Sequence, residues 1–204
     1  MDWEKLANSE SVKKTILSLK KRGISAEYFT TRNEVLNRII EIIPPHKKVM
    51  IGGSVSLKEI GFIDFLINGK HKWNNLKDEI MLEKDPIKQV YLRRLSTTSD
   101  FFLGSVHAVA ESGEIIVASE TGSQIPSYAY SSANVILVVG TQKIVANLNE
   151  GLKRVREYCL PSVNKKMKSL GMGGSIIGKI LIIEQETIRK PGLTLLFVNE
   201  KLGF

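Results

Sequence analysis

The chain has 204 residues, of which 43% are hydrophobic and 25% charged, and its formal net charge is +8. A chain of this length and composition can bury roughly 70% of its unfolded surface, which argues against disorder and for one globular domain. No apolar stretch reaches the ~20 residues that span a bilayer, and the polar start MDWEKLANSESVKK has no signal-peptide core. We therefore expect a cytoplasmic protein without a membrane partner.

The positive charge raises the question of nucleic-acid binding, because clustered Lys and Arg attract phosphate backbones. The basic segments are dispersed and lack interleaved aromatic residues; they lie at 19–23, 91–94, 152–157 and 164–169. Solvated helix faces explain them better. We expect no nucleic acid as a partner, and steep salt dependence of DNA binding would be needed to overturn this.

Metal binding also has little support. Cys159 is the single cysteine, so the chain has neither an intramolecular disulfide nor a cysteine-built zinc or iron–sulfur site. We expect Cys159 to be a small buried side chain on a helix. His46, His71 and His107 are far apart in sequence, and no histidine pair has helical i, i+4 spacing with a glutamate.

The first third of the chain is predicted to alternate between helices and strands. The expected segments are a helix over 2–22 ended by Gly23, a strand over 24–31, a helix over 32–43 ended by Pro44 and Pro45, a buried strand over 47–53, and a helical pattern over 54–69 that Gly61 interrupts. Residues 70–83 have no clean period and are predicted to form a crossing loop with a partial helix.

The rest of the chain is denser in strand signals. Asp85 as N-cap and Pro86 at the first helical position predict a helix over 85–99 with Val90, Leu92 and Leu95 as its apolar residues. The further segments are strands over 101–110 and 114–119 as an antiparallel pair around the turn ESG, an interior parallel strand over 134–140, a helix over 144–158, and strands over 178–185 and 193–200 around a Lys-Pro-Gly turn.

This order predicts the α/β class: a single-domain, open, mostly parallel sheet with helices on both faces and a local antiparallel hairpin. No linker or repeat divides the chain, so we expect one domain over 1–204, in which segment 1–45 packs onto the core formed by 46–204.

The stretch VMIGGSVSLKEIG at 49–61 is the first candidate site. A strand that stops on Gly52 and Gly53 and then enters a helix offers free backbone N–H groups to an anion, and the hydroxyls of Ser54 and Ser56 can assist. A tight turn that needs glycine only for packing is the alternative. Neither the dinucleotide pattern nor the phosphate loop is present, so we expect no NAD, ATP or other cofactor.

Polar residues gather a second time between 100 and 124. His107, in a predicted strand, has an ordinary pKa suited to proton transfer, and Glu111, before a turn, can serve as nucleophile or base. Asp100 and the segment ETGS (120–123) can complete a polar cleft. A hydrogen-bonded structural histidine, a solvated turn carboxylate and capping roles are the alternatives, and no serine-hydrolase elbow is present.

Four blocks stand in the order and spacing of one known family: IGGSVSLKEIG, TTSDFFLGSVHAVAESGEII, NVILVVGTQKIVANLNEGLKRVRE and LLFVNEKLGF. On these blocks the chain resembles the LUD-domain family of lactate utilisation proteins, also called DUF162, from the second helix to the C-terminus. The resemblance implies a fold similar to ribose-5-phosphate isomerase, glucosamine-6-phosphate deaminase and coenzyme A transferases. It also implies that the loop Gly52, Gly53 and Ser54 meets the anionic part of a ligand, and it suggests partner subunits that carry iron–sulfur clusters.

The sequence departs from the family pattern in two places. Members usually carry Gly-Asn-Arg after the hairpin, whereas this chain has Ser123 and Gln124 after Thr121 and Gly122, so an arginine's bidentate grip on a carboxylate is replaced by a neutral amide. This departure puts lactate itself in doubt as the ligand. Many members also have a cysteine-rich insertion near the C-terminus, where this chain has one cysteine, so any cluster must belong to a partner.

Two functions are proposed as hypotheses. The first is a LUD-domain protein of lactate or organic-acid utilisation that binds a small anionic metabolite and acts as an accessory component without its own redox centre. Its candidate ligand-binding residues are Gly52, Gly53, Ser54, Ser56, Thr121, Gly122 and Gln124. The alternative is an isomerase- or acyl-transferase-type enzyme that uses Glu111, Asp100 and His107. Phe62, Phe65 and Phe204 are candidates for a homodimer contact, with core packing as the alternative role.

Overall fold

The computed structural model describes residues 2–69, 71–188 and 192–204. Its centre is a six-stranded sheet in the order β1-β10-β7-β4-β2-β3, in which every neighbouring pair is parallel. The strands are β1 (Ser25–Phe29), β2 (Lys48–Ile51), β3 (Asn74–Asn75), β4 (Phe101–Gly104), β7 (Asn134–Gly140) and β10 (Leu193–Val198). The predicted α/β class with an open, mostly parallel sheet is confirmed.

A second, smaller sheet was not predicted. It has the order β8-β5-β6-β9 and consists of β5 (Ala108–Ala110), β6 (Ile115–Ser119), β8 (Ile144–Val145) and β9 (Lys179–Ile183). The expected antiparallel hairpin is the β5–β6 pair. The expected strand over 101–110 is wrong as one element, because the backbone leaves the main sheet at Ser105, whose hydroxyl donates to the Val138 carbonyl at 2.7 Å. The last two strands also separate: β9 pairs with β6 and β10 with β1 and β7, and Lys190 and Pro191 of the expected turn lie outside the described residues.

Capping side chains and glycine set the helix ends. The helices are α1 (Ser9–Lys21), α2 (Arg32–Ile42), α3 (Val55–Glu59), α4 (Phe62–Ile67), α5 (Leu76–Leu82), α6 (Pro86–Leu95), α7 (Leu148–Arg154) and α8 (Leu160–Ser169). α1 starts later than predicted because the Asn8 side chain accepts the Ser11 N–H at 2.8 Å as an N-cap. Gly61, with φ +79°, separates α3 from α4 within the segment predicted as an interrupted helix.

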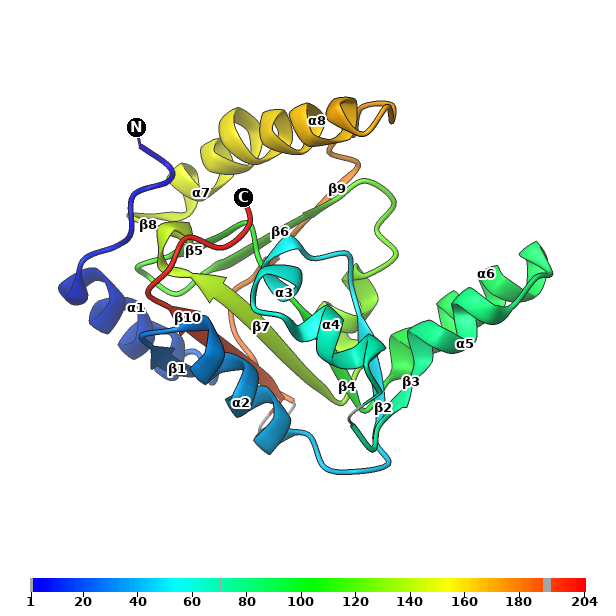
Figure 1. Ribbon diagram of the computed structural model, residues 1–204. Coiled ribbons are helices and arrows are strands. Elements are labelled where there is room, and N and C mark those ends of the chain that lie inside the picture. Colours follow the sequence, from blue (N-terminus) through cyan, green and yellow to red (C-terminus); the bar gives the residue numbers. More distant parts are fainter. Residues whose placement is uncertain (1, 70, 189–191) are drawn as a thin grey trace.

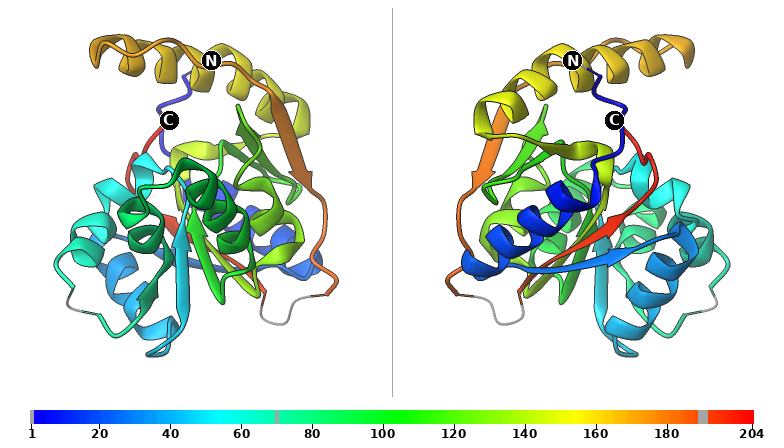
Figure 2. Two further views of the ribbon diagram at one scale, coloured as in Figure 1. Left: turned by 90° about the vertical axis from the view of Figure 1, so that its right-hand side faces the viewer. Right: turned by 90° about the vertical axis from the view of Figure 1, so that its left-hand side faces the viewer.

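The elements stack in layers on the main sheet. Along β7, Ile136 and Val138 face a core with α2, α3 and α4, whereas Val135, Leu137 and Val139 face a core with α1 and the small sheet, as the period of two requires. α7 packs on the outer face of the small sheet through a third cluster that includes Ala108 and Ile116. Figures 1 and 2 show α8 extended across the end of the molecule where both chain termini lie.

The helix predicted over 144–158 is longer and divided. Its first residues form β8, α7 comes next, and a π-helical turn over Val155–Cys159 leads into α8. Cys159 is buried, as predicted. Phe62 is fully buried and Phe65 packs on the same core cluster, so core packing accounts for both. Among the described residues, no helix is long and apolar enough to cross a membrane.

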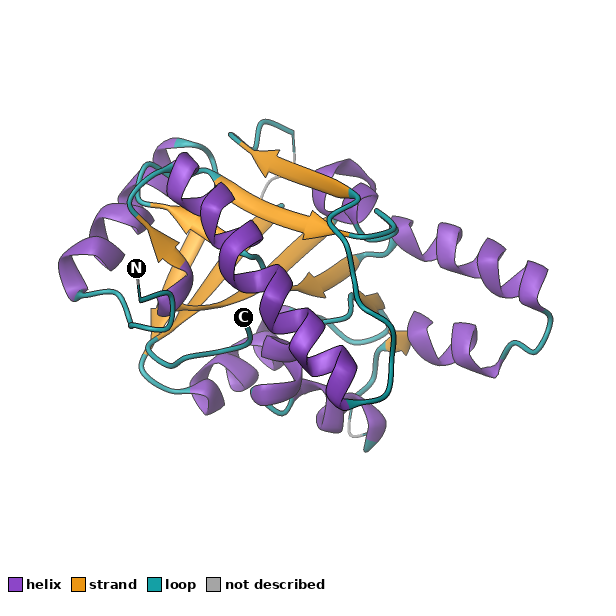
Figure 3. Ribbon diagram, turned by 90° about the horizontal axis from the view of Figure 1, so that it is seen from above, coloured by secondary structure: helices purple, strands orange, loops and turns teal. Residues whose placement is uncertain are grey.

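α5 and α6 form a helical hairpin over 76–95 that projects from the body of the molecule (Figures 1 and 3). The partial helix expected over 70–83 is α5, and the helix expected over 85–99 is α6, capped by Asp85. Val90 and Leu95 are about half exposed, and α6 contains no buried residue.

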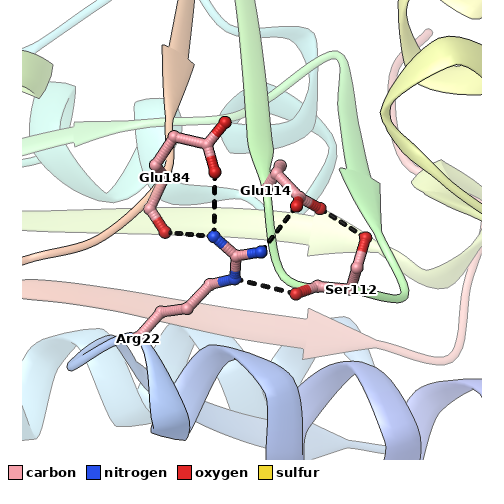
Figure 4. Close-up of polar contacts among 4 residues, drawn as sticks. All are labelled: Arg22, Ser112, Glu114 and Glu184. Carbon is pink, nitrogen blue, oxygen red and sulfur yellow. Dashed lines mark hydrogen bonds and ion pairs between the residues drawn. The ribbon is translucent and has the colours of Figure 1, made fainter.

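Arg22, just after α1, joins α1 to the small sheet (Figure 4). Its guanidinium donates to the Ser112 carbonyl in the β5–β6 turn, to the Glu114 carboxylate, and to both the carbonyl and the carboxylate of Glu184 beyond β9. The N–H of Glu186 in turn donates to the Arg22 carbonyl. This network fixes the hairpin against α1.

Candidate functional site

Three connections meet at one edge of the main sheet. Because β2, β4 and β7 are parallel, their carboxyl ends lie side by side, and they continue into 52–56, 105–107 and 141–143. Ligands of open α/β sheets gather at this edge. The site predicted from VMIGGSVSLKEIG therefore lies at the correct end of the sheet for a ligand.

A cavity of about 280 Å³ opens at this edge. α8 contributes to its wall from above, and the C-terminal residues contribute from the side. Its lining residues are Gly53, Ser54, Val55, Ser56, Ser105, Val106, His107, Gln124, Lys143, Val163, Lys166, Met167, Leu170, Gly203 and Phe204. The wall thus combines hydroxyls, one imidazole, one amide and two lysines with apolar side chains of α8, a composition typical of a small-molecule site.

Lys143 is the central charged residue of the cavity, and the sequence analysis missed it. It follows β7 in a 3-10 turn over Thr141–Lys143 and is 2% exposed. Its ammonium donates to Ser56 Oγ at 3.1 Å and to Ser105 Oγ at 3.0 Å. These two hydroxyls come from the ends of different strands, so one lysine joins three connections.

No carboxylate neutralises this lysine within the described part of the chain, where none of the ion pairs involves it. Burial, and secondarily the nearby Arg154 cation, lower the pKa of Lys143 from 10.5 to about 7, and Cys159 and Glu59 act in the opposite direction. A buried cation without a counter-charge is costly. The cavity therefore favours either a neutral amine or a bound anion.

Arg154 adds a second buried positive charge behind the cavity. Its guanidinium donates to the His107 carbonyl, to Cys159 Sγ at 3.1 Å and to the Trp3 carbonyl at 3.4 Å, and it lies 5.0 Å from the Tyr158 ring centroid. Burial lowers the pKa of Arg154. Neutral acceptors hold this guanidinium, so it strengthens the positive potential at the site.

His107 lies in the cavity wall, as the sequence analysis proposed, but it is uncharged. Burial, with contributions from Lys143 and Arg154, lowers the pKa of His107 from 6.5 to about 3. The Ala118 N–H donates to His107 Nδ1 at 3.0 Å, so the ring proton is on Nε2. His107 is therefore suited to donate a hydrogen bond, not to accept and release protons at neutral pH.

The glycine-serine loop forms the opposite wall. Gly53 has no atom within 4 Å of the position where a Cβ would lie, so its backbone faces open space. The Ser54 hydroxyl accepts the Leu57 N–H at 3.2 Å and caps α3, whereas Ser56 is buried and bonded to Lys143. Ser54 therefore caps the helix, and Gly53 and Ser56 line the cavity.

Gln124 separates this cavity from a second one of about 290 Å³ at the base of the helical hairpin. Both cavities include Gln124 and Gly53 in their walls, and the second adds the cations Lys77 and Arg93. A Cβ on Gly52 would lie 2.7 Å from Gln124 Oε1 and 3.2 Å from Phe102 Cζ, so the Gln124 amide and the Phe102 ring pack closely on Gly52. The two cavities adjoin at the Gln124 amide.

The remaining predicted residues lie elsewhere. Thr121 and Gly122 border neither of the two cavities; the Thr121 hydroxyl contacts Ser123, and the Gly122 N–H donates to Ser119. Asp100 is at the amino end of β4, where its carboxylate accepts the Lys48 N–H at 2.8 Å. That end is roughly 13 Å of strand from the carboxyl edge.

Glu111 also points away from the cavity. Its carboxylate accepts the Ser11 hydroxyl at 2.6 Å and pairs with Lys14 at 2.8 Å, both on α1. Hydrogen bonding from Lys14 and Ser11 lowers the pKa of Glu111 and keeps it ionised. The structure brings His107 to the cavity but not Glu111 or Asp100, so these three do not form one catalytic group.

Lys166 and Phe204 were also missed as site residues. Lys166 projects from α8 with its ammonium 5.8 Å from the Phe204 ring centroid, and both line the cavity. Phe204 was proposed as a dimer contact, and its position here gives it another role. The sequence signal for Lys143 was a lysine three residues after the apolar strand β7, near the carboxyl end of a parallel strand, where ligands bind.

Comparison with known proteins identifies the family of this chain. The model of the LUD domain matches residues 12–193. A crystal structure of a DUF162 family protein from Deinococcus radiodurans has the same fold, with a TM-score of 0.59 and 12% sequence identity, over 96% of this chain and 100% of that one. No curated protein matches this chain significantly.

Proposed function

This chain belongs to the LUD-domain family, and we propose that it binds a small organic anion in the cavity around Lys143. A monocarboxylate of the 2-hydroxy or 2-oxo acid type is the ligand class that best fits. The proposal rests mainly on one observation: the buried ammonium of Lys143 is hydrogen-bonded to two neutral hydroxyls and has no ion pair in the described chain.

A bound anion would supply the negative counter-charge that Lys143 does not receive from the described part of the protein. A carboxylate beside Lys143 converts an unpaired buried cation into an ion pair, and the two serine hydroxyls keep the ammonium oriented. Lys166 at the rim and Arg154 behind the wall add positive potential. The carboxylate grip that Gln124 cannot offer is thus available from lysine, which restores lactate and pyruvate as candidates.

The test is thermal stabilisation by a panel of anions: lactate, pyruvate, phosphate, a sugar phosphate and an acyl-coenzyme A. A ligand at ~100 times its dissociation constant stabilises the folded state by about 2.7 kcal/mol, a shift of several degrees. Lys143→Met should abolish the shift of the active anion. Lys168→Met, on the exposed side of the same helix as Lys166, should leave the shift unchanged.

Gly53 offers a matched pair of variants, because its Cβ position is empty. Gly53→Asp places a negative charge at the cavity wall, and Gly53→Asn places an amide of nearly the same size there. Loss of binding in the aspartate variant with retention in the asparagine variant supports an anion at this wall. Equal loss in both variants, or no stabilisation by any anion, would contradict the proposal.

We also propose that the chain acts as an accessory component of organic-acid utilisation, as its resemblance to lactate utilisation proteins suggests. Within the described residues, no group of three His, Cys, Asp or Glu side chains gathers as a metal centre requires. Under this proposal the redox step takes place in a partner that carries an iron–sulfur cluster. Co-purification of the chain with such a partner, dependent on an intact Lys143, would test it.

A second candidate, an enzyme of the isomerase type, is favoured by the pKa of about 7 at Lys143. An amine with this pKa can accept a proton from a substrate carbon at neutral pH, with the Nε2–H of His107 as donor to the substrate oxygen. This version replaces Glu111 and Asp100, which lie outside the cavity. Deuterium uptake from D₂O into a bound 2-oxo acid or sugar phosphate, lost in Lys143→Met, would favour it over simple binding.

A further inference from the structure

The helical arm, defined as α5 and α6 (76–95), leaves an apolar surface without a covering element. The arm projects from the body of the molecule (Figures 1 and 3). α5 anchors it through Ile80, which is buried, whereas α6 packs mainly on α5 and has no buried residue. Helices of this length are marginal in water and depend on burying an apolar face.

The apolar face of α6 points to solvent. Its exposed apolar residues have the spacing i, i+3, i+4, i+8, which places them on one side of the helix: Ile87, Val90, Tyr91 and Leu95. Ile87 is 81% exposed. On α5, Met81 and Leu82 are exposed in the last turn of the helix. A contiguous apolar stripe on a protruding helix is typical of an interaction surface.

Charges divide between the two helices. The α6 stripe is accompanied by Lys88 and Arg94. On α5, Asp78 and Glu79 lie in the first turn, one turn before Met81 and Leu82, and Lys77 of the same turn lines the second cavity. Neither these two cations of α6 nor the two carboxylates of α5 form an ion pair within the described chain. The arm therefore carries one apolar surface with cations and another with carboxylates, which are complementary to each other.

We propose that the arm is the dimer interface of this protein, in which α6 of one copy packs against α5 of a second copy. A two-fold axis makes such an interface self-complementary, because each contact between α6 and α5 occurs twice. The pairing covers the stripe that includes Ile87 and Val90 and places Lys88 and Arg94 near the partner's carboxylates. A second copy complements the charges of both the α5 and the α6 surface, whereas a partner with charges of only one sign complements only one of them.

The experiment is the mass of the full chain in solution, by light scattering and sedimentation over a range of concentrations. The wild type is expected to have twice the mass of one chain. Ile87→Lys with Val90→Lys should weaken the dimer by about 30-fold or more, as loss of interface anchors does. Leu17→Lys, at an equally exposed apolar residue on α1, is the matched control and should remain dimeric.

Charge exchange tests the pairing of α6 with α5 directly. One variant carries Lys88→Glu and Arg94→Glu, and the other Asp78→Lys and Glu79→Lys. Each alone should be monomeric because like charges face each other, and an equimolar mixture should form a heterodimer. A monomeric wild type at all concentrations, a dimer unaffected by the α6 substitutions, or a mixture that stays monomeric would overturn the proposal. Circular dichroism of each variant checks that the fold is retained.

Discussion

Replacing Lys143 should make the protein more stable and less able to bind its ligand. Lys143→Met keeps an unbranched side chain that is shorter only by the ammonium group, and it removes the buried charge. The hydroxyls it leaves behind retain acceptors, because Ser105 donates to the Val138 carbonyl at 2.7 Å and Ser56 to the Leu202 carbonyl at 3.2 Å. The substitution therefore creates no unsatisfied buried donor at these two serines.

The lowered pKa of Lys143 sets the size of the expected change in the free energy of unfolding. One pKa unit corresponds to about 1.4 kcal/mol, so lowering the pKa of Lys143 from 10.5 to about 7 corresponds to about 5 kcal/mol of cost to the folded state when the amine is charged. Two lost hydrogen bonds of about 1 kcal/mol each offset part of the gain. We expect Lys143→Met to raise the free energy of unfolding by about 2–3 kcal/mol at pH 6.

The stability of the wild-type protein should depend on pH through Lys143. Between pH 7 and 10.5 the unfolded chain binds this proton and the folded chain does not, so the wild type gains stability as the pH rises through this window. The gain from Lys143→Met should therefore be largest at pH 6 and disappear by about pH 10. Urea unfolding of both proteins at a series of pH values, in a buffer without multivalent anions, measures it. A variant that is destabilised equally at pH 6 and pH 10 would refute the reasoning.

Three further predictions concern stability. Arg22→Met should cost about 2 kcal/mol in urea unfolding, because it removes the contacts to Glu114 and Glu184 that join α1 to the small sheet; a change below ~0.5 kcal/mol would contradict the network. Gly203→Ala should lower the free energy of unfolding by about 1–3 kcal/mol and weaken anion binding, because the φ angle of Gly203 is +63° and the new Cβ would lie 2.8 Å from Ser56 Oγ. An unchanged melting temperature and unchanged binding would show that the C-terminus adapts freely to the new side chain. Thr31→Ala should cost about 1 kcal/mol in the same assay through loss of the α2 capping box, and a smaller loss than in Arg22→Met is expected.

Local signals predicted the elements well and their surroundings poorly. Asp85 and Pro86 correctly indicated where α6 begins, and Gly61 correctly indicated an interruption. Periodicity, however, shows which residues share one face of a helix, but it does not show what that face packs against. Val90, Leu92 and Leu95 were named as the apolar residues of α6, but their spacing does not show that Val90 and Leu95 are about half exposed.

The candidate site was predicted in part for a similar reason. A strand that ends on Gly52 and Gly53 identifies the carboxyl edge of a parallel sheet, and that edge is where the cavity lies. Glu111 had two predicted roles, a solvated turn carboxylate or a catalytic group in the cleft, and the sequence did not show that the chain after Ser105 enters a second sheet. Lys143 was missed because lysine is rarely buried, and its burial results from contacts made by distant segments.

The cost of the buried lysine predicts how binding should couple to protons. At pH 8 the free protein holds Lys143 mostly as the neutral amine, since its pKa is about 7. An anion that pairs with the ammonium raises this pKa toward its ordinary value, so binding at pH 8 should take up close to one proton from the buffer. Calorimetry in buffers with different ionisation enthalpies measures the uptake, which should fall toward zero at pH 5.5, where the amine is already charged. Binding without proton uptake at pH 8 would mean that the anion does not contact Lys143, and the ligand would then have to be sought beside Lys77 and Arg93 in the adjoining cavity.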